Sequence, residues 1–266
     1  MRSIRPPLAL AACLLLGACA TLPPNTQRDA RDPFERYNRA MYRFNRGLDK
    51  AVLRPAARGY VRIVPQPIRT GVHNFLSNLA YPRTLVNDAL QGKLKDSGTD
   101  LARFSANTVL GLGFFDPATA MGLDKHEEDF GQTLGRWGVA SGPYLMLPLL
   151  GPSTVRDGLG RLPDEYTTPR HYVKDSKVRW GLAALDVFDT RVGLLDSEHL
   201  LEQSFDEYSF VRNAYLRRRN FQVHDGDVPD ESPEEPPFEA PADTPSSTPQ
   251  PAPAPAVSPA AAPPPH

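Results

Sequence analysis

The stretch Asp32-Pro-Phe-Glu-Arg-Tyr-Asn-Arg-Ala-Met-Tyr-Arg-Phe-Asn45 predicts a helix and sets the pattern for the segment that follows it. Asp32 can serve as the N-cap, Pro33 suits the first turn, and Glu35 completes a capping box. Behind this start, apolar residues recur at steps of three and four, which places them on one face of a helix. They are Phe34, Tyr37, Met41, Phe44, Leu48 and Val52.

Three later segments show the same helical spacing. We find no sustained alternation of apolar and polar residues around Asn-Gly or Asp-Gly turns, so hairpins are not expected. The sequence therefore predicts an all-α fold for one domain at residues 32–224, which is long enough to bury a core. The spaced apolar residues are Val72, Phe75, Leu76 and Leu79, then Leu101, Phe104 and Val109, then Phe205, Tyr208, Val211 and Tyr215.

The N-terminus has the layout of an export signal. A short basic start precedes an apolar run, Leu8 to Leu16, which is too short to span about 30 Å of hydrocarbon as a helix. The run ends in Leu-Gly-Ala-Cys19, which resembles the bacterial lipobox, where cleavage leaves an acylated cysteine as the first residue. We therefore expect a lipoprotein signal peptide at residues 1–18 and lipidation of Cys19. The alternative is an ordinary signal peptide cut after Ala18, with Cys19 as an incidental thiol.

Cysteine use favours lipidation. The second cysteine, Cys13, lies inside the leader, so an exported Cys19 has no disulfide partner. Several acyl chains hold a protein firmly at a membrane, where one alone is marginal. In lipoprotein sorting, an aspartate just after the cysteine retains the protein in the inner membrane. Ala20 stands there instead, which predicts a lipid-anchored protein of the outer membrane.

Composition divides the rest of the exported chain. Residues 19–31 are predicted to form a lipidated tether, and residues 225–266 an acidic, Pro/Ala-rich tail. The tail is expected to be disordered because it cannot bury enough apolar surface to offset its ordering entropy. The tail carries acidic residues and no Lys or Arg, so the body is left with a net positive charge. This charge suits anionic lipid, although a solvated surface without a partner fits it equally well.

Two apolar segments rich in Gly and Pro depart from the amphipathic pattern. They cover residues 109–123 and 138–152. Neither is long enough for a standard transmembrane helix, and both are too apolar for an ordinary surface loop. One interpretation makes them buried core connections. The other makes them backbone that lies in a membrane or lines a lipid-sized cavity, where glycine permits bending and close approach.

The body resembles the MlaA (VacJ) family of outer-membrane lipoproteins from Asp32 to about Arg219. The matching motifs are Asp32 to Asn45, Val64-Pro-Gln-Pro-Ile-Arg69, Asn74-Phe-Leu-Ser-Asn-Leu79, Leu90-Gln-Gly92, Arg103-Phe-Ser-Ala-Asn-Thr-Val-Leu-Gly111, Glu128-Asp-Phe-Gly-Gln-Thr-Leu-Gly135, Gly151-Pro-Ser-Thr-Val-Arg-Asp157 and Arg212-Asn-Ala-Tyr215.

The resemblance implies a ring-shaped helical body embedded in the inner leaflet of the outer membrane, at its periplasmic face. Such a protein takes mislocalised phospholipids from the outer leaflet through an amphipathic channel and passes them to a periplasmic carrier protein, which maintains lipid asymmetry. The family also associates with trimeric porins. The resemblance implies no catalysis, no cofactor, no metal and no nucleic-acid partner.

The resemblance also suggests site residues. Residues 138–152 would lie beside the channel, with Gly138, Gly142, Pro143 and Tyr144 as channel or hinge candidates. Ala140 stands where some relatives carry another glycine, which weakens the case for a two-glycine hinge. Further candidates are polar groups near the apolar wall, with helix capping as the alternative, and apolar contacts for lipid or porin, with core packing as the alternative. The polar candidates are Asn107 and Asp116, and the apolar ones are Leu145, Leu147, Pro148 and Leu150.

Two sequence patterns partly resemble motifs of enzymes. Gly151-Pro-Ser-Thr-Val155 lacks the second glycine of a nucleophile elbow, and His126-Glu-Glu-Asp129 lacks the second histidine of a helical zinc site. A non-enzymatic protein is therefore expected. The remaining alternative is a structural lipoprotein that tethers the envelope, although a tether would not need the two apolar segments.

Overall fold

The computed structural model describes residues 29–228. The predicted leader, Cys19, most of the tether and nearly all of the tail lie outside these residues. The all-α prediction is confirmed, with one short hairpin in addition. The elements are α2 (Glu35–Leu48), η1 (Asp49–Leu53), α3 (Arg54–Ile63), α4 (Gln66–Gln91), α5 (Leu94–Val109), α6 (Pro117–Ala120), α7 (Phe130–Arg136), β1 (Tyr144–Leu147), β2 (Gly151–Thr154), α8 (Val155–Thr167), η2 (Pro169–Tyr172), α9 (Ser176–Gly193), η3 (Leu195–Ser197), α10 (Glu198–Glu202) and α11 (Glu207–Val223).

The first helix begins later than predicted. Phe34 is the N-cap of α2 and no side chain caps it, so the prediction of Asp32 as the cap is wrong. Asp32 is instead buried, where its carboxylate accepts hydrogen bonds from the Asn38 amide (2.8 Å) and the Arg212 guanidinium (3.1 Å) and from the Tyr208 hydroxyl. An acidic residue before a helix can cap it or pair with a distant cation, and Asp32 pairs with the distant Arg212.

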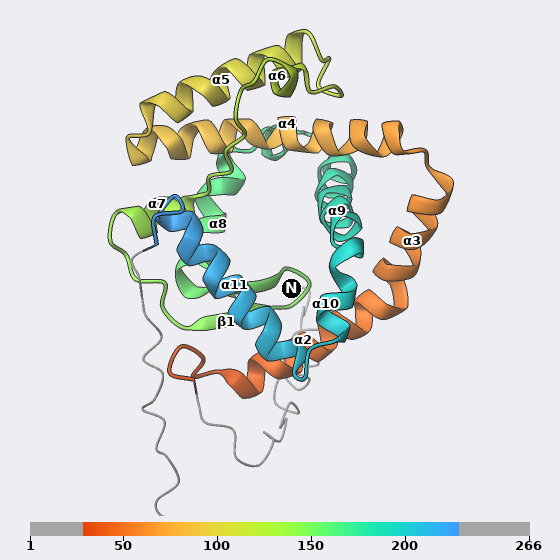
Figure 1. Cartoon of the computed structure of the whole chain (residues 1–266), viewed down its shortest axis with the longest axis vertical. Helices are drawn as coiled ribbons and strands as arrows, with labels where there is room; N and C mark the ends of the chain where they lie inside the picture. Colours follow the sequence, from red (N-terminus) through yellow and green to blue (C-terminus); the bar gives the residue numbers. More distant parts are fainter. Residues whose placement is uncertain (1–28, 229–266) are drawn as a thin grey trace, which may run out of the picture. The chain divides into compact units, whose positions relative to one another are not determined.

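The helices of residues 29–228 follow one another around a closed circuit (Figure 1). α2 continues through the π-helical turn η1 into α3, and Pro65 then starts α4. α4 contacts α7 and α8, and α7 contacts α11. α11 contacts β2, whose partner β1 contacts α2, so the circuit closes where it began. α9 lies along another side of it and contacts both α3 and α4 (Figure 1).

α7 and α8 pack with their backbones in close approach. A Cβ atom added at Gly160 of α8 would lie 2.6 Å from the backbone nitrogen of Gly131 in α7, closer than atoms can pack. Gly160 is therefore required, because only its missing side chain lets the two helices meet at this distance. A Cβ at Gly131 would instead lie 2.7 Å from the side chains of Arg219 and Asp157.

The hairpin of β1 and β2 corrects the expectation that hairpins are absent. The strands are antiparallel, with Tyr144 opposite Thr154 and Leu147 opposite Gly151. The turn uses left-handed backbone at Leu149 (φ 65°) and Gly151 (φ 78°) in place of Asn-Gly. Each strand has four residues and apolar residues occupy both faces of β1, so the sequence shows no alternation to detect.

α2 pairs with the free edge of β1 through two asparagines. Asn38 donates to the Tyr144 carbonyl (3.0 Å) and accepts from the Met146 N–H (2.8 Å). Asn45 donates to the Leu147 carbonyl (2.9 Å) and accepts from the Leu149 N–H (2.8 Å). Each side-chain amide therefore satisfies one backbone donor and one backbone acceptor, as a third strand would.

Burial in the described residues is the reverse of that in an ordinary globular core. Buried polar and charged residues outnumber buried apolar ones, and the apolar cluster is small. It consists of Tyr144, Met146 and Tyr208, with Met41, Tyr42, Val211, Tyr215 and Leu216 packed against it. Many large apolar side chains instead face outward, from α3 through α6, on α8 and along α9.

The outward apolar surface is densest on residues 94–123, which we call the apolar arm; it comprises α5, α6 and their connections. Val109 is 71% exposed, Leu112 74% and Phe115 69%. The interpretation of residues 109–123 as a buried connection is therefore wrong. Within residues 29–228, no helix has the length and apolar character needed to cross a membrane.

Candidate functional site

The main candidate site lies inside the circuit of helices. It is a cavity of about 900 Å³, and its walls come from segments far apart in the chain. The segment before α7, together with α8 and α11, contributes charged residues, and Arg83 reaches in from α4. The hairpin turn contributes apolar residues, and α9 contributes both apolar and charged ones. The volume lies in the range of pockets that bind small organic ligands, about 300–1,000 Å³.

Arg219 of α11 organises the charged side, which we call the polar wall. Its guanidinium donates to Asp129 at 2.6 and 2.9 Å and to Asp157 at 3.1 and 2.9 Å. Asp157 also accepts from the Tyr215 hydroxyl (2.7 Å) and from Arg156 (3.1 Å). The Arg219 guanidinium thus links α11 to the start of α7 and to the first turn of α8. Its paired hydrogen bonds fix its orientation.

Two carboxyl groups in this wall have opposite electrostatic environments. Burial alone would raise the pKa of Asp129, but its hydrogen bonds with Arg219 outweigh burial and lower the pKa to about 2. Burial raises the pKa of Asp164 to about 6, and the negative charge of Asp129 adds to the effect. Asp164 accepts from the Phe130 N–H and from the Asn87 amide, and it lacks a cation of its own within ion-pair distance in residues 29–228.

The apolar lining of the cavity comes from α9 and the hairpin turn, and α9 places Arg179 and Asp186 beside it. Trp180, Ala183 and Val187 recur at helical spacing on α9, and Leu149 and Leu150 reach in from the hairpin turn. Trp180 is 70% exposed and Leu149 62%, so these side chains contact the cavity and are not packed away. A cavity with a charged wall facing an apolar one matches the chemistry of an amphipathic ligand.

The two polar candidates from the sequence meet at α6, away from the residues that line the cavity. Asp116 is the N-cap of α6 and accepts from the Thr119 N–H (3.0 Å), while Asn107 accepts from the Ala118 N–H (3.1 Å). Both side chains accept from backbone N–H groups at the start of α6, as the helix-capping alternative predicts. Their neighbour Arg103, 2% exposed, donates to both Asp116 oxygens at 2.9 and 3.0 Å.

The glycine and proline candidates form the connection from α7 to the hairpin. Gly138 ends α7 in left-handed backbone (φ 87°), and the Val139 N–H donates to the Leu134 carbonyl (2.9 Å), which is a Schellman C-cap. Gly142 is also left-handed (φ 66°), and a Cβ there would lie 3.3 Å from the Val155 Cβ. Pro143, half-buried, then leads into β1. Their role as a hinge stays a prediction.

The remaining candidates lie on the hairpin. Tyr144 belongs to the small apolar core, and burial raises the pKa of its hydroxyl, which has no hydrogen-bond partner among the described residues. Leu145 and Leu147 are half-buried, and Pro148 is exposed. Leu150, 55% exposed, is the candidate that lines the cavity. Contact of this group with lipid or porin stays a prediction.

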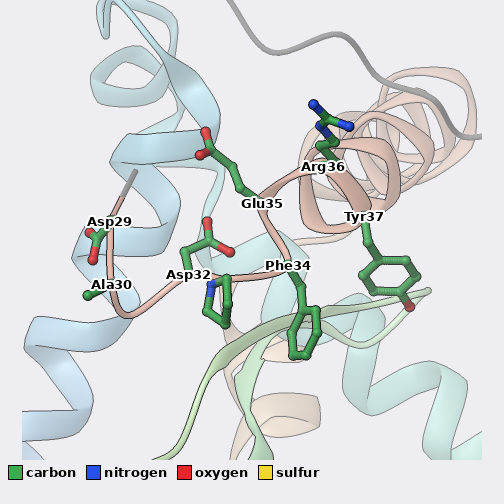
Figure 2. A pocket seen from close by; sticks show the side chains of 8 residues that line it. Asp29, Ala30, Asp32, Phe34, Glu35, Arg36 and Tyr37 are labelled. Atoms are coloured by element: carbon green, nitrogen blue, oxygen red, sulfur yellow. The ribbon is translucent and has the colours of Figure 1, made fainter. Parts of the chain in front are cut away.

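A second hollow of about 590 Å³ lies at the start of α2. Figure 2 shows the carboxylates of Asp29, Asp32 and Glu35 on one side of it and the rings of Phe34 and Tyr37 on the other. The acidic groups are already engaged, because Glu35 accepts from Arg39 (2.7 Å) and the other two pair with arginines. This hollow therefore offers its lining acids little freedom to bind a ligand.

One Ser–His–Asp contact occurs in the described chain. His73 Nδ1 lies 2.8 Å from Asp189, and His73 Nε2 lies 3.5 Å from Ser77 Oγ. Ser77 and His73 are one turn apart on α4, where the backbone N–H groups are bonded within the helix. Ser77 thus gains no oxyanion donors from its own helix, although acyl transfer requires such donors beside the nucleophile.

Comparison with known proteins identifies the family. The profile of the family described as "MlaA lipoprotein" matches residues 30–222. The chain belongs to this family. The "Intermembrane phospholipid transport system lipoprotein MlaA" of Escherichia coli (strain K12) is 39% identical over 235 residues, covering 85% of this chain and 91% of that protein. The protein of the same name from Haemophilus influenzae is 36% identical over 230 residues, covering 83% and 90%. The family prediction from the sequence is confirmed.

A solved structure supports the same assignment. It comes from work described as "Structural basis for maintenance of bacterial outer membrane lipid asymmetry" and is 39% identical. Its TM-score is 0.67, and the match covers 74% of this chain and 100% of that one. The MlaA-family fold thus accounts for the described domain.

Sequence reasoning did not identify the residues of the polar wall. Asp129, Asp157 and Arg219 lie inside or beside the motifs that carry the family resemblance, yet they look like ordinary surface charges in sequence. A signal was present for Asp129 and Asp157, which stand next to glycines and apolar residues, but Arg219 lies in a run of three arginines. Only the packing of α7, α8 and α11 shows that these charges meet.

Proposed function

We propose that this protein is the outer-membrane lipoprotein of an intermembrane phospholipid transport system. In this role it removes mislocalised phospholipids from the outer leaflet and passes them to a periplasmic lipid carrier, which maintains lipid asymmetry. The observation that carries the proposal is the cavity, where the polar wall faces the apolar side chains of α9 and the hairpin turn. The names of the relatives supply the pathway.

The reversed burial supports an embedded position in one membrane leaflet. Soluble monomers rarely expose apolar patches larger than a few hundred Å², because such surface is unfavourable in water. Here Val109, Leu112 and Phe115 project from the apolar arm, and Ile63 and Leu162 are similarly exposed elsewhere. Surrounding acyl chains would remove this surface from water, while the polar groups stay paired within the protein.

The charges of the cavity suit a phospholipid headgroup. Three of its arginines, Arg83, Arg161 and Arg179, have no carboxylate within ion-pair distance in residues 29–228. A phosphate could accept hydrogen bonds from them as Arg219 already pairs with Asp129 and Asp157. The acyl chains would then contact Trp180, Val187 and the hairpin tip. The bound lipid would move without any covalent step, so we expect no enzyme activity.

The other parts of the proposal concern placement and partners. Lipidation of Cys19 would anchor the chain at the periplasmic face of the outer membrane, with residues 19–31 as tether and residues 225–266 as a tail. A trimeric porin would contact the body, and the apolar exposure of Leu149 and Leu150 supports a lipid or protein neighbour near the hairpin.

The test is lipid transfer between vesicles with a matched pair of tryptophan substitutions. Ala183→Trp fills the cavity side of α9, whereas Ala102→Trp lies on the exposed side of α5 outside the cavity. We expect the wild-type chain and Ala102→Trp to transfer fluorescent phospholipid without forming lysophospholipid, and Ala183→Trp to transfer about tenfold more slowly, since a cavity side chain would occupy ligand volume. Equal rates for both variants would contradict the cavity route. Stable folding without any transfer would favour the structural-tether alternative.

A further inference from the structure

The arginines of α2 are sorted into two sets. Arg39 and Arg46 point toward the rest of the fold and are saturated by acids, Arg39 by Glu35 (2.7 Å) and Asp206 (2.6 Å), and Arg46 by Glu207 (3.1 Å). These cations serve the internal packing of the helix against α11. Their charge is already matched and is not free for a partner.

A second set lies on the outer face. Arg36, Arg43 and Lys50 are exposed and follow one another at intervals of seven residues along α2 and into η1. Seven residues turn a helix through nearly two full turns, so the three side chains form one stripe. Across the described part of the chain, no carboxylate lies within ion-pair distance of any of them. We call these three residues the basic stripe.

An exposed aromatic side chain flanks the basic stripe on α2. Phe44 is 53% exposed. By helical phase, Phe44 lies about 80° from Arg36, next to the stripe rather than opposite it. A helix with cations beside aromatic and aliphatic residues is typical of segments that lie in a membrane–water interface, with the apolar side chains at the acyl boundary.

We propose that the basic stripe binds the anionic phospholipid headgroups of the membrane surface and so sets the depth and tilt of the body. This inference rests on the proposed function, which supplies a leaflet made of phospholipid. Charge complementarity selects the partner: unmatched cations at one level of an interfacial helix meet phosphate at the same level. Each cation near an anionic surface strengthens binding several-fold, and the effect falls off within a Debye length.

Vesicle binding tests this with protein carrying Cys19→Ser, so that no acyl chain contributes. The probes are vesicles of phosphatidylcholine alone and of an equal mixture with phosphatidylglycerol. The test variant combines Arg36→Gln, Arg43→Gln and Lys50→Gln. The control makes the same change in charge at three exposed cations outside α2 and the apolar arm that have no ion-pair partner in residues 29–228, through Lys174→Gln, Lys177→Gln and Arg217→Gln. The rescue variant, Arg36→Lys with Arg43→Lys and Lys50→Arg, restores the charge.

We expect wild-type, control and rescue proteins to bind the mixed vesicles more tightly than phosphatidylcholine. The test variant should bind the mixed vesicles about 100-fold more weakly than wild type and bind phosphatidylcholine as well as wild type does. Added salt should remove the difference between the vesicles.

Four outcomes would overturn the proposal. Equal losses in the test and control variants would show a general charge effect, and a rescue variant that stays weak would show damage to α2. Equal binding of the wild-type protein to both vesicles would indicate that the basic stripe binds an acidic protein segment and not lipid headgroups. Failure of the wild-type protein to bind either vesicle would contradict the embedded position itself, and thus the proposed function as well.

Discussion

The polar wall and the apolar arm differ in which side chains they expose: the wall hides its charges, and the arm exposes its apolar groups. In the wall, Arg219, Asp129 and Asp157 turn their charges toward one another and are largely hidden. In the arm, Val109 and Phe115 present most of their apolar surface outward. The wall draws stability from contacts inside the protein, whereas the arm depends on what surrounds it. The contrast supports the proposed embedded position, in which apolar solvent surrounds the outside and polar groups gather inside.

Arg219→Ala should break the wall and give the largest effect. The substitution leaves Asp129 and Asp157 buried beside each other without their shared cation, which costs about 3–5 kcal/mol in the free energy of unfolding. Urea denaturation in mild detergent measures it. Arg218→Ala is the matched control on the same helix; Arg218 is 70% exposed, and the change should stay within about 0.5 kcal/mol. Equal losses for the two variants would refute the central role of Arg219.

Asp88 and Asp100 should make the junction of α4 and α5 sensitive to pH, with a smaller effect. Both are fully buried, and burial together with their mutual repulsion raises the pKa of Asp88 to about 7. Burial also raises the pKa of Asp100, although His126 lies 3.0 Å away and opposes the shift. The charged groups near the pair are Glu128, its ion-pair partner Lys93, and Lys125. Tyr81, whose hydroxyl accepts from Arg103, also lies near Asp100.

The sign of the effect follows from proton binding. A carboxyl group whose pKa is raised on folding holds its proton more firmly in the folded state than in the unfolded one. Stability from Asp88 is therefore present below about pH 4 and is lost as the pH rises toward about 7. Asp164, whose pKa is raised to about 6, adds a loss of the same sign. Asp88→Asn should flatten the pH dependence of the urea midpoint between these limits, and an unchanged slope would contradict the assignment.

The smallest change in stability is expected in the apolar arm. Val109→Asn with Phe115→Asn alters exposed side chains only, so the free energy of unfolding in detergent should change by less than about 0.5 kcal/mol. Binding to phosphatidylcholine vesicles should weaken about tenfold because apolar contact with acyl chains is lost. Ala56→Asn, exposed on α3 outside the apolar arm, is the control. A large loss of stability with unchanged vesicle binding would reverse the roles that we assign to the arm and the wall.

The helical body could be predicted because spacing alone specifies it. The apolar periodicity after Asp32 and around Phe75 identifies α2 and α4 correctly. The hairpin could not be predicted, because the edge of β1 is satisfied by Asn38 and Asn45, more than 90 residues earlier in the chain. Such a contact leaves no local signal in the strand.

The site was predicted less completely than the fold. The family resemblance implied that residues 138–152 lie beside a channel, and this stays a prediction; of these residues, Leu149 and Leu150 line the cavity. Asn107 and Asp116 were chosen as polar residues in apolar surroundings, and the structure places them at the start of α6. Which charges face a cavity depends on the packing of helices distant in sequence, and periodicity within one helix does not reveal it.

The two asparagines of α2 have a further geometric consequence. Between Asn38 and Asn45 the helix advances seven residues, about 10.5 Å at 1.5 Å per residue. Their partners in the hairpin advance three residues, from Tyr144 to Leu147 and from Met146 to Leu149, about 10.2 Å at 3.4 Å per residue. The two repeats are thus commensurate. The spacing of the two asparagines on α2 therefore fixes the position of the hairpin along the helix axis. It also fixes where the hairpin tip meets the cavity.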